Sequence, residues 1–80
     1  MIPSTGALLK LKPGTIWHNA YVIDCSDSII AEMHFTEDDL AVFLSARPDI
    51  WNPDSTRYRC LVGDKIVLFN PNCLTEVRSE

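Results

Sequence analysis

The sequence contains no long uninterrupted run of apolar residues. The longest stretches, such as Leu40–Leu44 and Ile66–Phe69, are far shorter than the ~20 residues that a membrane-spanning helix needs. Residues 1–14 show no basic start followed by an apolar core, so we expect no secretory signal. The sequence therefore predicts a cytoplasmic protein with no membrane partner.

The sequence lacks a disulfide framework, because its cysteines are odd in number and widely spaced. The chain has three cysteines and no Cys-x-x-Cys pair. Structural zinc sites usually draw their ligands from close pairs, whereas no two of the zinc-competent side chains here lie within four residues of one another. These are His18, Cys25, His34, Cys60 and Cys73. We expect reduced thiols and no bound metal.

Glycine is also rare, and catalytic motifs are missing. None of Gly6, Gly14 and Gly63 opens a predicted helix, which argues against a phosphate-binding loop. Neither histidine belongs to a recognisable nucleophile motif. Adjacent carboxylates on a helix point in different directions, so those of residues 37–39 would not converge on one substrate atom. The sequence predicts no catalytic residue and no cofactor, and we do not expect an enzyme.

Positive charge is in the minority. Seven Lys and Arg stand against eleven Asp and Glu, for a net charge of −4, and residues 24–54 hold eight acidic side chains against one arginine. A protein that grips nucleic acid needs a basic stripe that displaces counterions from phosphates. Direct nucleic-acid binding is therefore not expected, although the acidic segment would suit a basic groove on a partner protein.

What the chain does have is the composition of a globular protein. Its 80 residues, 46% hydrophobic and 22% charged, are enough for one domain over residues 1–80. We expect these residues to be mostly buried: Leu9, Leu11, Ile23, Met33, Phe35, Leu40, Phe43, Tyr58, Cys60, Ile66 and Leu68.

Alternating apolar residues predict strands in the N-terminal half. Leu9 and Leu11 share one face of a short strand that ends at Pro13-Gly14. Residues 20–25 are rich in β-branched and aromatic side chains, and the turn-forming residues 26–28 precede a second alternating run over 29–35. This pattern predicts a hairpin with Met33 and Phe35 on its core side.

A helix is predicted over residues 36–47. The hydroxyl of Thr36 can cap the amide of Asp39, and acidic residues at 37–39 suit the positive end of a helix dipole. Pro48 ends the helix, and a turn-rich connection follows to Thr56. Apolar residues follow the cap at helical spacing: Leu40, Phe43 and Leu44.

The C-terminal third predicts a strand over 57–62, a tight turn at Gly63-Asp64, a strand over 65–70, an Asn-Pro-Asn break and a last strand over 74–78. This order resembles the end of a Src-homology-3-like small barrel. Residues 58–77, YRCLVGDKIVLFNPNCLTEV, are similar to small accessory proteins encoded by bacteriophages. We therefore expect a mostly β (α+β) fold: a small antiparallel Src-homology-3-like β-barrel of five or six strands with one inserted α-helix at about 36–47.

The resemblance implies an interaction module that carries no catalytic residue. The function expected is a non-catalytic phage or mobile-element accessory protein that docks on a host protein, in the host cytoplasm, and modulates or inhibits it. Two alternatives stay open. One is an acidic nucleic-acid mimic that inhibits a host nucleic-acid-binding defence complex, and the other is a small metalloprotein or enzyme. The sequence does not predict the oligomeric state.

The candidate binding surface combines acidic side chains with one aromatic anchor. Placed at the two ends of the predicted helix, these residues could flank a single acidic face: Glu37, Asp38, Asp39, Asp49, Trp51 and Asp54. The competing interpretation is that the acids satisfy the helix dipole and that Trp51 caps the barrel. In that case the binding surface would lie on the opposite side, around Arg57, Arg59 and Lys65.

Overall fold

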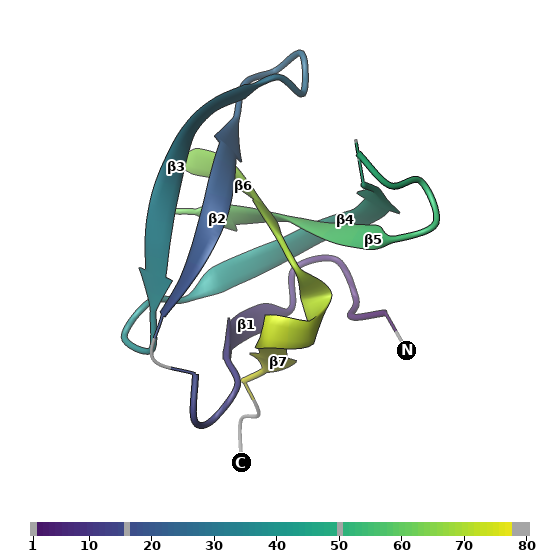
Figure 1. Ribbon diagram of the computed structural model, residues 1–80. Coiled ribbons are helices and arrows are strands. Elements are labelled where there is room, and N and C mark those ends of the chain that lie inside the picture. The colour runs from purple at the N-terminus through teal and green to yellow at the C-terminus, as the bar shows by residue number, and fades with distance from the viewer. Residues whose placement is uncertain (1, 16, 50, 78–80) are drawn as a thin grey trace.

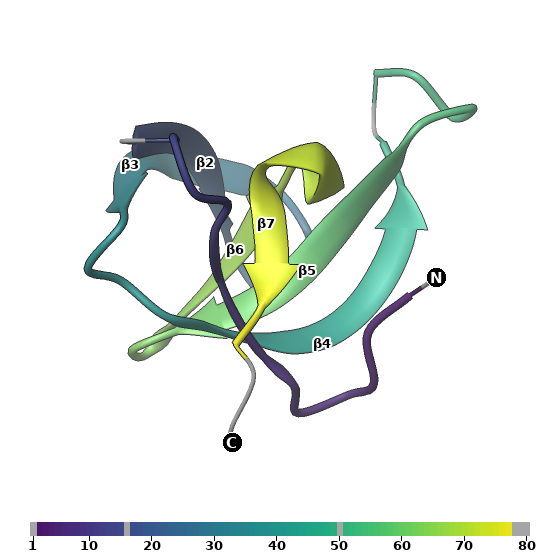
Figure 2. The same cartoon turned by 90° about the horizontal axis from the view of Figure 1, so that it is seen from below.

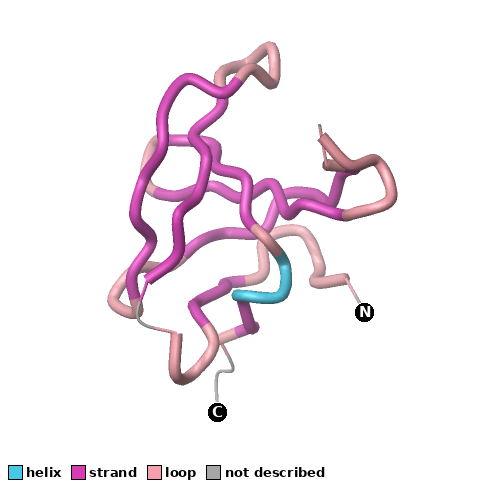
Figure 3. Tube along the Cα trace, viewed as in Figure 1, coloured by secondary structure: helices cyan, strands magenta, loops and turns pink. Residues whose placement is uncertain are grey.

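The computed structural model describes residues 2–15, 17–49 and 51–77. Within them the chain is mostly β with almost no helix, and seven antiparallel strands form one sheet that curls into a half-barrel (Figures 1 and 3). The strand order is β3-β2-β6-β5-β4-β1-β7. The elements are β1 (Leu8–Leu11), β2 (Trp17–Ile23), β3 (Ile29–Thr36), β4 (Ala41–Pro48), β5 (Thr56–Val62), β6 (Lys65–Phe69), the 3-10 turn η1 (Pro71–Cys73) and β7 (Leu74–Glu76).

The hairpin predicted in the N-terminal half is confirmed as β2 and β3, which pair antiparallel along their whole length. A side-chain-stabilised turn joins them. One oxygen of Asp24, Oδ1, accepts hydrogen bonds from the amides of Ser26 at 2.9 Å and Ser28 at 3.0 Å. Asp27 takes a left-handed backbone conformation with φ 64°, which carboxylate and amide side chains tolerate better than most. The position of this turn was predictable from the turn-forming residues 26–28.

The C-terminal order of elements is confirmed as well. Gly63 opens the turn between β5 and β6 with φ 63°, the left-handed conformation that glycine adopts without steric cost. The side chain of Asn70 accepts a hydrogen bond from the Asn72 amide at 3.0 Å and caps η1. Strand β7 then pairs with β1, where Leu11 lies opposite Leu74. The first and last strands thereby meet at one edge of the sheet (Figure 2).

The helix predicted over 36–47 is wrong, because residues 41–48 form strand β4 between β1 and β5. Thr36 and Asp39, which suggested a helix cap, form a turn instead. Asp39 Oδ2 accepts hydrogen bonds from the Thr36 amide at 2.9 Å and the Thr36 hydroxyl at 3.2 Å. The register of β4 against β5 shifts between Phe43 and Ser45. Such a bulge adds one residue to a strand, and it leaves Phe43 and Ala46, three residues apart, both packed in the core.

The core lies inside the curl of the sheet. Phe35 and Phe69 meet edge to face with ring centroids 4.8 Å apart, and Phe43 and Tyr58 do so at 5.0 Å. Seven of the predicted core residues are buried: Leu9, Leu11, Ile23, Phe35, Phe43, Cys60 and Leu68. Met33, Tyr58 and Ile66 are half-buried. The buried residues that the sequence patterns did not single out are Ala20, Val22, Ala41, Val67, Phe69 and Leu74.

Leu40 is the one predicted core residue that is exposed, at 51%. The helix-like spacing of Leu40, Phe43 and Leu44 predicts it on a buried stripe. In the structure it ends the turn between β3 and β4, where no element of the sheet covers it.

Candidate recognition surface

The loop between β4 and β5, residues 49–55, presents an exposed tryptophan on a fixed framework. Asp49 is only 9% exposed. Its Oδ1 accepts a hydrogen bond from the Trp51 amide at 3.0 Å, and its Oδ2 pairs with Arg57 Nε at 3.1 Å. The Asp49 amide donates to the Ser55 carbonyl at 2.9 Å and closes the loop. Asp49 therefore fixes the backbone that carries Trp51.

The Trp51 side chain stands over the outer face of the sheet. Tyr58 and Cys60 of β5 face the core, so Arg59 faces outward, and its neighbours across the sheet are Leu68 and Tyr21. The Tyr21 and Trp51 rings meet edge on, with centroids 5.6 Å apart at an angle of 64°. Trp51 is nevertheless 64% exposed. The contact orients the indole without burying it.

The six candidate binding residues fall into two groups. Asp49, Trp51 and Asp54 lie in the loop between β4 and β5, whereas Glu37, Asp38 and Asp39 lie in the turn between β3 and β4. The two connections are at opposite ends of β4 (Figures 1 and 2), and an eight-residue strand spans up to about 26 Å. The structure thus brings three of the six together around Trp51 and places the other three at the far end of the strand.

The acidic side chains also differ in what they do. Glu37, Asp38 and Asp54 are exposed. Asp39 accepts the hydrogen bonds of its own turn, and Asp49 is paired with Arg57. Glu37 additionally borders a shallow hollow that Lys10 and Lys12 line.

The outer face carries a cluster of arginines, although the net charge of the protein is −4. Arg47 of β4 lies opposite Arg57 of β5, and Arg59 follows two residues later on the same face. Arg47 Nη1 pairs with Asp27 Oδ2 at 2.9 Å, and Arg59 Nε lies 3.9 Å from Asp27 Oδ1. Sequence reasoning named Arg57 and Arg59 as an alternative surface but missed Arg47 and Asp27, because no local motif links residues 20 or more positions apart.

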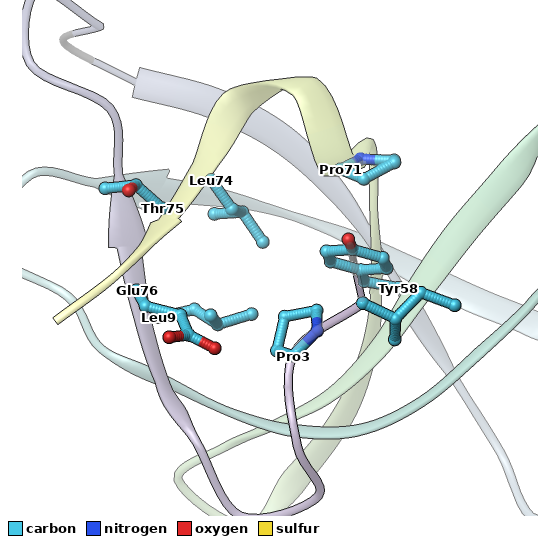
Figure 4. Close-up of a pocket in the computed structure, with 8 residues that line it drawn as sticks. Pro3, Leu9, Tyr58, Pro71, Leu74, Thr75 and Glu76 are labelled. Carbon is cyan, nitrogen blue, oxygen red and sulfur yellow. The ribbon is translucent and has the colours of Figure 1, made fainter.

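An apolar hollow of about 240 Å³ lies beside β1 and β7. The side chains of Leu9, Tyr58 and Leu74 face into it, and Glu76 is the carboxylate on its rim (Figure 4). Sites for drug-sized ligands usually measure about 300 to 1,000 Å³ and contain several convergent polar groups. This hollow is smaller and mainly apolar, so it does not have the form of a small-molecule site.

Two titratable side chains, Cys60 and His18, contribute to the packing of the core. Burial raises the pKa of the Cys60 thiol to about 12, which keeps it protonated and a poor nucleophile. His18 stacks on Phe69 with ring centroids 6.2 Å apart. Burial, and then the nearby Arg57 guanidinium, lower the pKa of His18 below its usual value.

All three cysteines are free thiols, with Cys25 exposed, Cys60 buried and Cys73 half-buried. In the part of the chain that the structure describes, no three His, Cys, Asp or Glu side chains gather to hold a metal ion. No helix among the described residues is long and apolar enough to cross a membrane.

The chain matches no protein-family model, no curated protein and no solved structure.

Proposed function

We propose that this protein is a non-catalytic protein-binding module whose binding surface is centred on Trp51. One observation carries the proposal: Trp51 is largely exposed although its backbone is held by the buried Asp49 and its ring by Tyr21. A tryptophan buries a large apolar area when a partner covers it, and such residues dominate binding energy at interfaces. A side chain that is already oriented loses little entropy on binding.

We further propose that the fold is a Src-homology-3-like barrel and that the protein is a phage or mobile-element accessory protein that acts on a host protein. Two features support the barrel: the one-turn 3-10 break between β6 and β7, and the return of β7 to β1. The likeness of residues 58–77 to small phage proteins supports the origin. The modulated partner would then be a protein of the host cytoplasm.

Affinity capture with matched variants tests the proposal. Tagged wild-type protein, Trp51→Ala and Ile30→Ala are each incubated with host lysate, and bound proteins are quantified by mass spectrometry. Ile30 is a suitable control because it is 61% exposed and lies on β3. Loss of a central anchor costs about 2 kcal/mol or more. We expect a partner that wild type and Ile30→Ala retain equally and that Trp51→Ala retains at least ~10-fold less.

Equal retention by Trp51→Ala and wild type would contradict the proposal. The binding surface would then not include Trp51.

A further inference from the structure

The outer face of β4 and β5 concentrates positive charge in a protein whose net charge is −4. Three of the four arginines in the chain, Arg47, Arg57 and Arg59, lie side by side on it. The fourth, Arg78, lies outside the described residues. The three arginine side chains are each only partly exposed, and carboxylates beside them supply part of the opposite charge.

The carboxylates do not balance these arginines. Arg57 pairs with Asp49, and Arg47 and Arg59 share the single carboxylate of Asp27. The Arg59 Nε to Asp27 Oδ1 distance of 3.9 Å is too long for a hydrogen bond. Arg59 Nε is buried and has no hydrogen-bond partner. This cluster therefore holds one positive charge more than its carboxylates neutralise.

The same residues line an open hollow of about 450 Å³. Its lining residues come from β4, β5 and the turn between β2 and β3: Cys25, Asp27, Ser45, Arg47, Pro48 and Arg59. The Ser45 hydroxyl adds a neutral donor, and Ser45 lies directly opposite Arg59 in the sheet. The hollow has room for a group the size of a phosphate and offers donors from two neighbouring strands.

Asp27 reaches this hollow from the turn between β2 and β3. Its φ of 64° is a left-handed conformation that aspartate adopts more readily than most residues other than glycine. The hydrogen bonds of Asp24 to Ser26 and Ser28 hold the turn in this shape. The Asp27 side chain itself is 46% exposed, so water can take over its contacts when it moves away from the arginines.

We propose that Arg47, Arg59 and Ser45 form a binding site for a dianionic phosphate group, and that the Asp27 carboxylate occupies this site in the free protein. A ligand with a single carboxylate would only replace the charge that Asp27 already supplies. A phosphate dianion brings a second charge and a third acceptor oxygen, and guanidinium groups bind phosphate oxygens through paired hydrogen bonds. Trp51 is not among the residues that line this hollow, and the proposal does not depend on the proposed function.

The test is an NMR titration with inorganic phosphate at constant ionic strength, following the Nε–Hε signals of Arg47 and Arg59. Wild-type protein should show weak, saturable shifts at both arginines, and acetate should shift them far less. In Asp27→Asn the competing charge is gone, while asparagine keeps the left-handed turn. We expect Asp27→Asn to bind phosphate roughly 5- to 10-fold more tightly.

Two further variants separate a site from general attraction. Arg59→Gln should weaken phosphate binding about 10-fold. Lys65→Gln removes the same charge from the exposed start of β6 and should leave the affinity unchanged. O-phosphoserine and adenosine monophosphate should both bind, and the tighter of the two identifies the natural source of the phosphate group.

The proposal fails if Asp27→Asn binds phosphate no more tightly than wild type. It also fails if Lys65→Gln weakens binding as much as Arg59→Gln, or if neither phosphate monoester binds. Should Arg59→Gln not fold, the comparison of Asp27→Asn with wild type decides alone.

Discussion

At the scale of single residues, burial and partners separate side chains that look alike in the sequence. Asp49, Asp54 and Asp38 all appear as surface acids of an acidic segment. Asp49 is nevertheless buried, accepts a hydrogen bond from the Trp51 amide and pairs with Arg57, whereas Asp38 and Asp54 are exposed. Residue type therefore indicated where charge lies, but the role of each carboxylate depends on strands that are distant in sequence.

The three thiols should differ in reactivity in the native protein. Cys25 is exposed, whereas Cys60 is buried and its pKa is raised to about 12, so little thiolate forms there at neutral pH. With a chromogenic thiol reagent we expect one fast reaction per chain, lost in Cys25→Ser, a slower one from Cys73, and three thiols in denaturant. Rapid labelling of Cys60 in the folded protein would show that the core is not packed as described.

His18 should make stability depend on pH. Burial and Arg57 lower its pKa in the folded state below the value of 6.5 expected for the unfolded chain. As the pH falls through about 6.5 towards the folded-state pKa, the unfolded state binds the proton first, so the free energy of unfolding decreases. Urea unfolding at a series of pH values measures this decline.

The decline should be smaller in His18→Gln than in the wild-type protein. An identical decline in wild type and His18→Gln would show that His18 is not its source.

At the scale of elements, local signals predicted the connections better than the long-range pairing. The β2–β3 turn, the Gly63 turn and the Asn70 cap each depend on residues within a few positions of one another, and all three were predictable. Strand β4 was not, because Leu40, Phe43 and Leu44 have a helix-like spacing although only Phe43 of the three is buried. Its strand conformation depends on pairing with β1 and β5, which no local pattern reports.

Substitutions at Leu40 and Phe43 distinguish the strand from the predicted helix. On a buried helical stripe both residues would be costly to replace. In the structure Leu40 is exposed and Phe43 is buried, so Leu40→Gln should change the free energy of unfolding by less than about 1 kcal/mol. Phe43→Ala should lower it by ~3 to 5 kcal/mol. Comparable losses from both substitutions, measured by urea unfolding, would contradict the observed turn and strand.

At the scale of the whole molecule, the curl of the sheet decides which surfaces exist. Strand β1 lies between β4 and β7, so the first and last strands of the chain are neighbours in the curled sheet. This arrangement leaves the acidic turn at residues 37–39 and the Trp51 loop at opposite ends of β4 (Figure 1). The sequence predicted Trp51 in a long polar loop. The cluster of Asp27, Arg47 and Arg59 was not predictable, because it joins the β2–β3 turn to β4 and β5, which only the folded sheet brings together.

The central claim is that Trp51 serves recognition and is not needed by the fold, and equilibrium unfolding of Trp51→Ala tests it most directly. The indole is 64% exposed, and its described ring contact is with Tyr21; an aromatic pair contributes about 0.5 to 1.5 kcal/mol. We predict that Trp51→Ala lowers the free energy of unfolding by no more than about 1.5 kcal/mol, well below the loss for Phe43→Ala. A loss equal to that of Phe43→Ala would show that Trp51 is needed for the stability of the fold, and would contradict the claim.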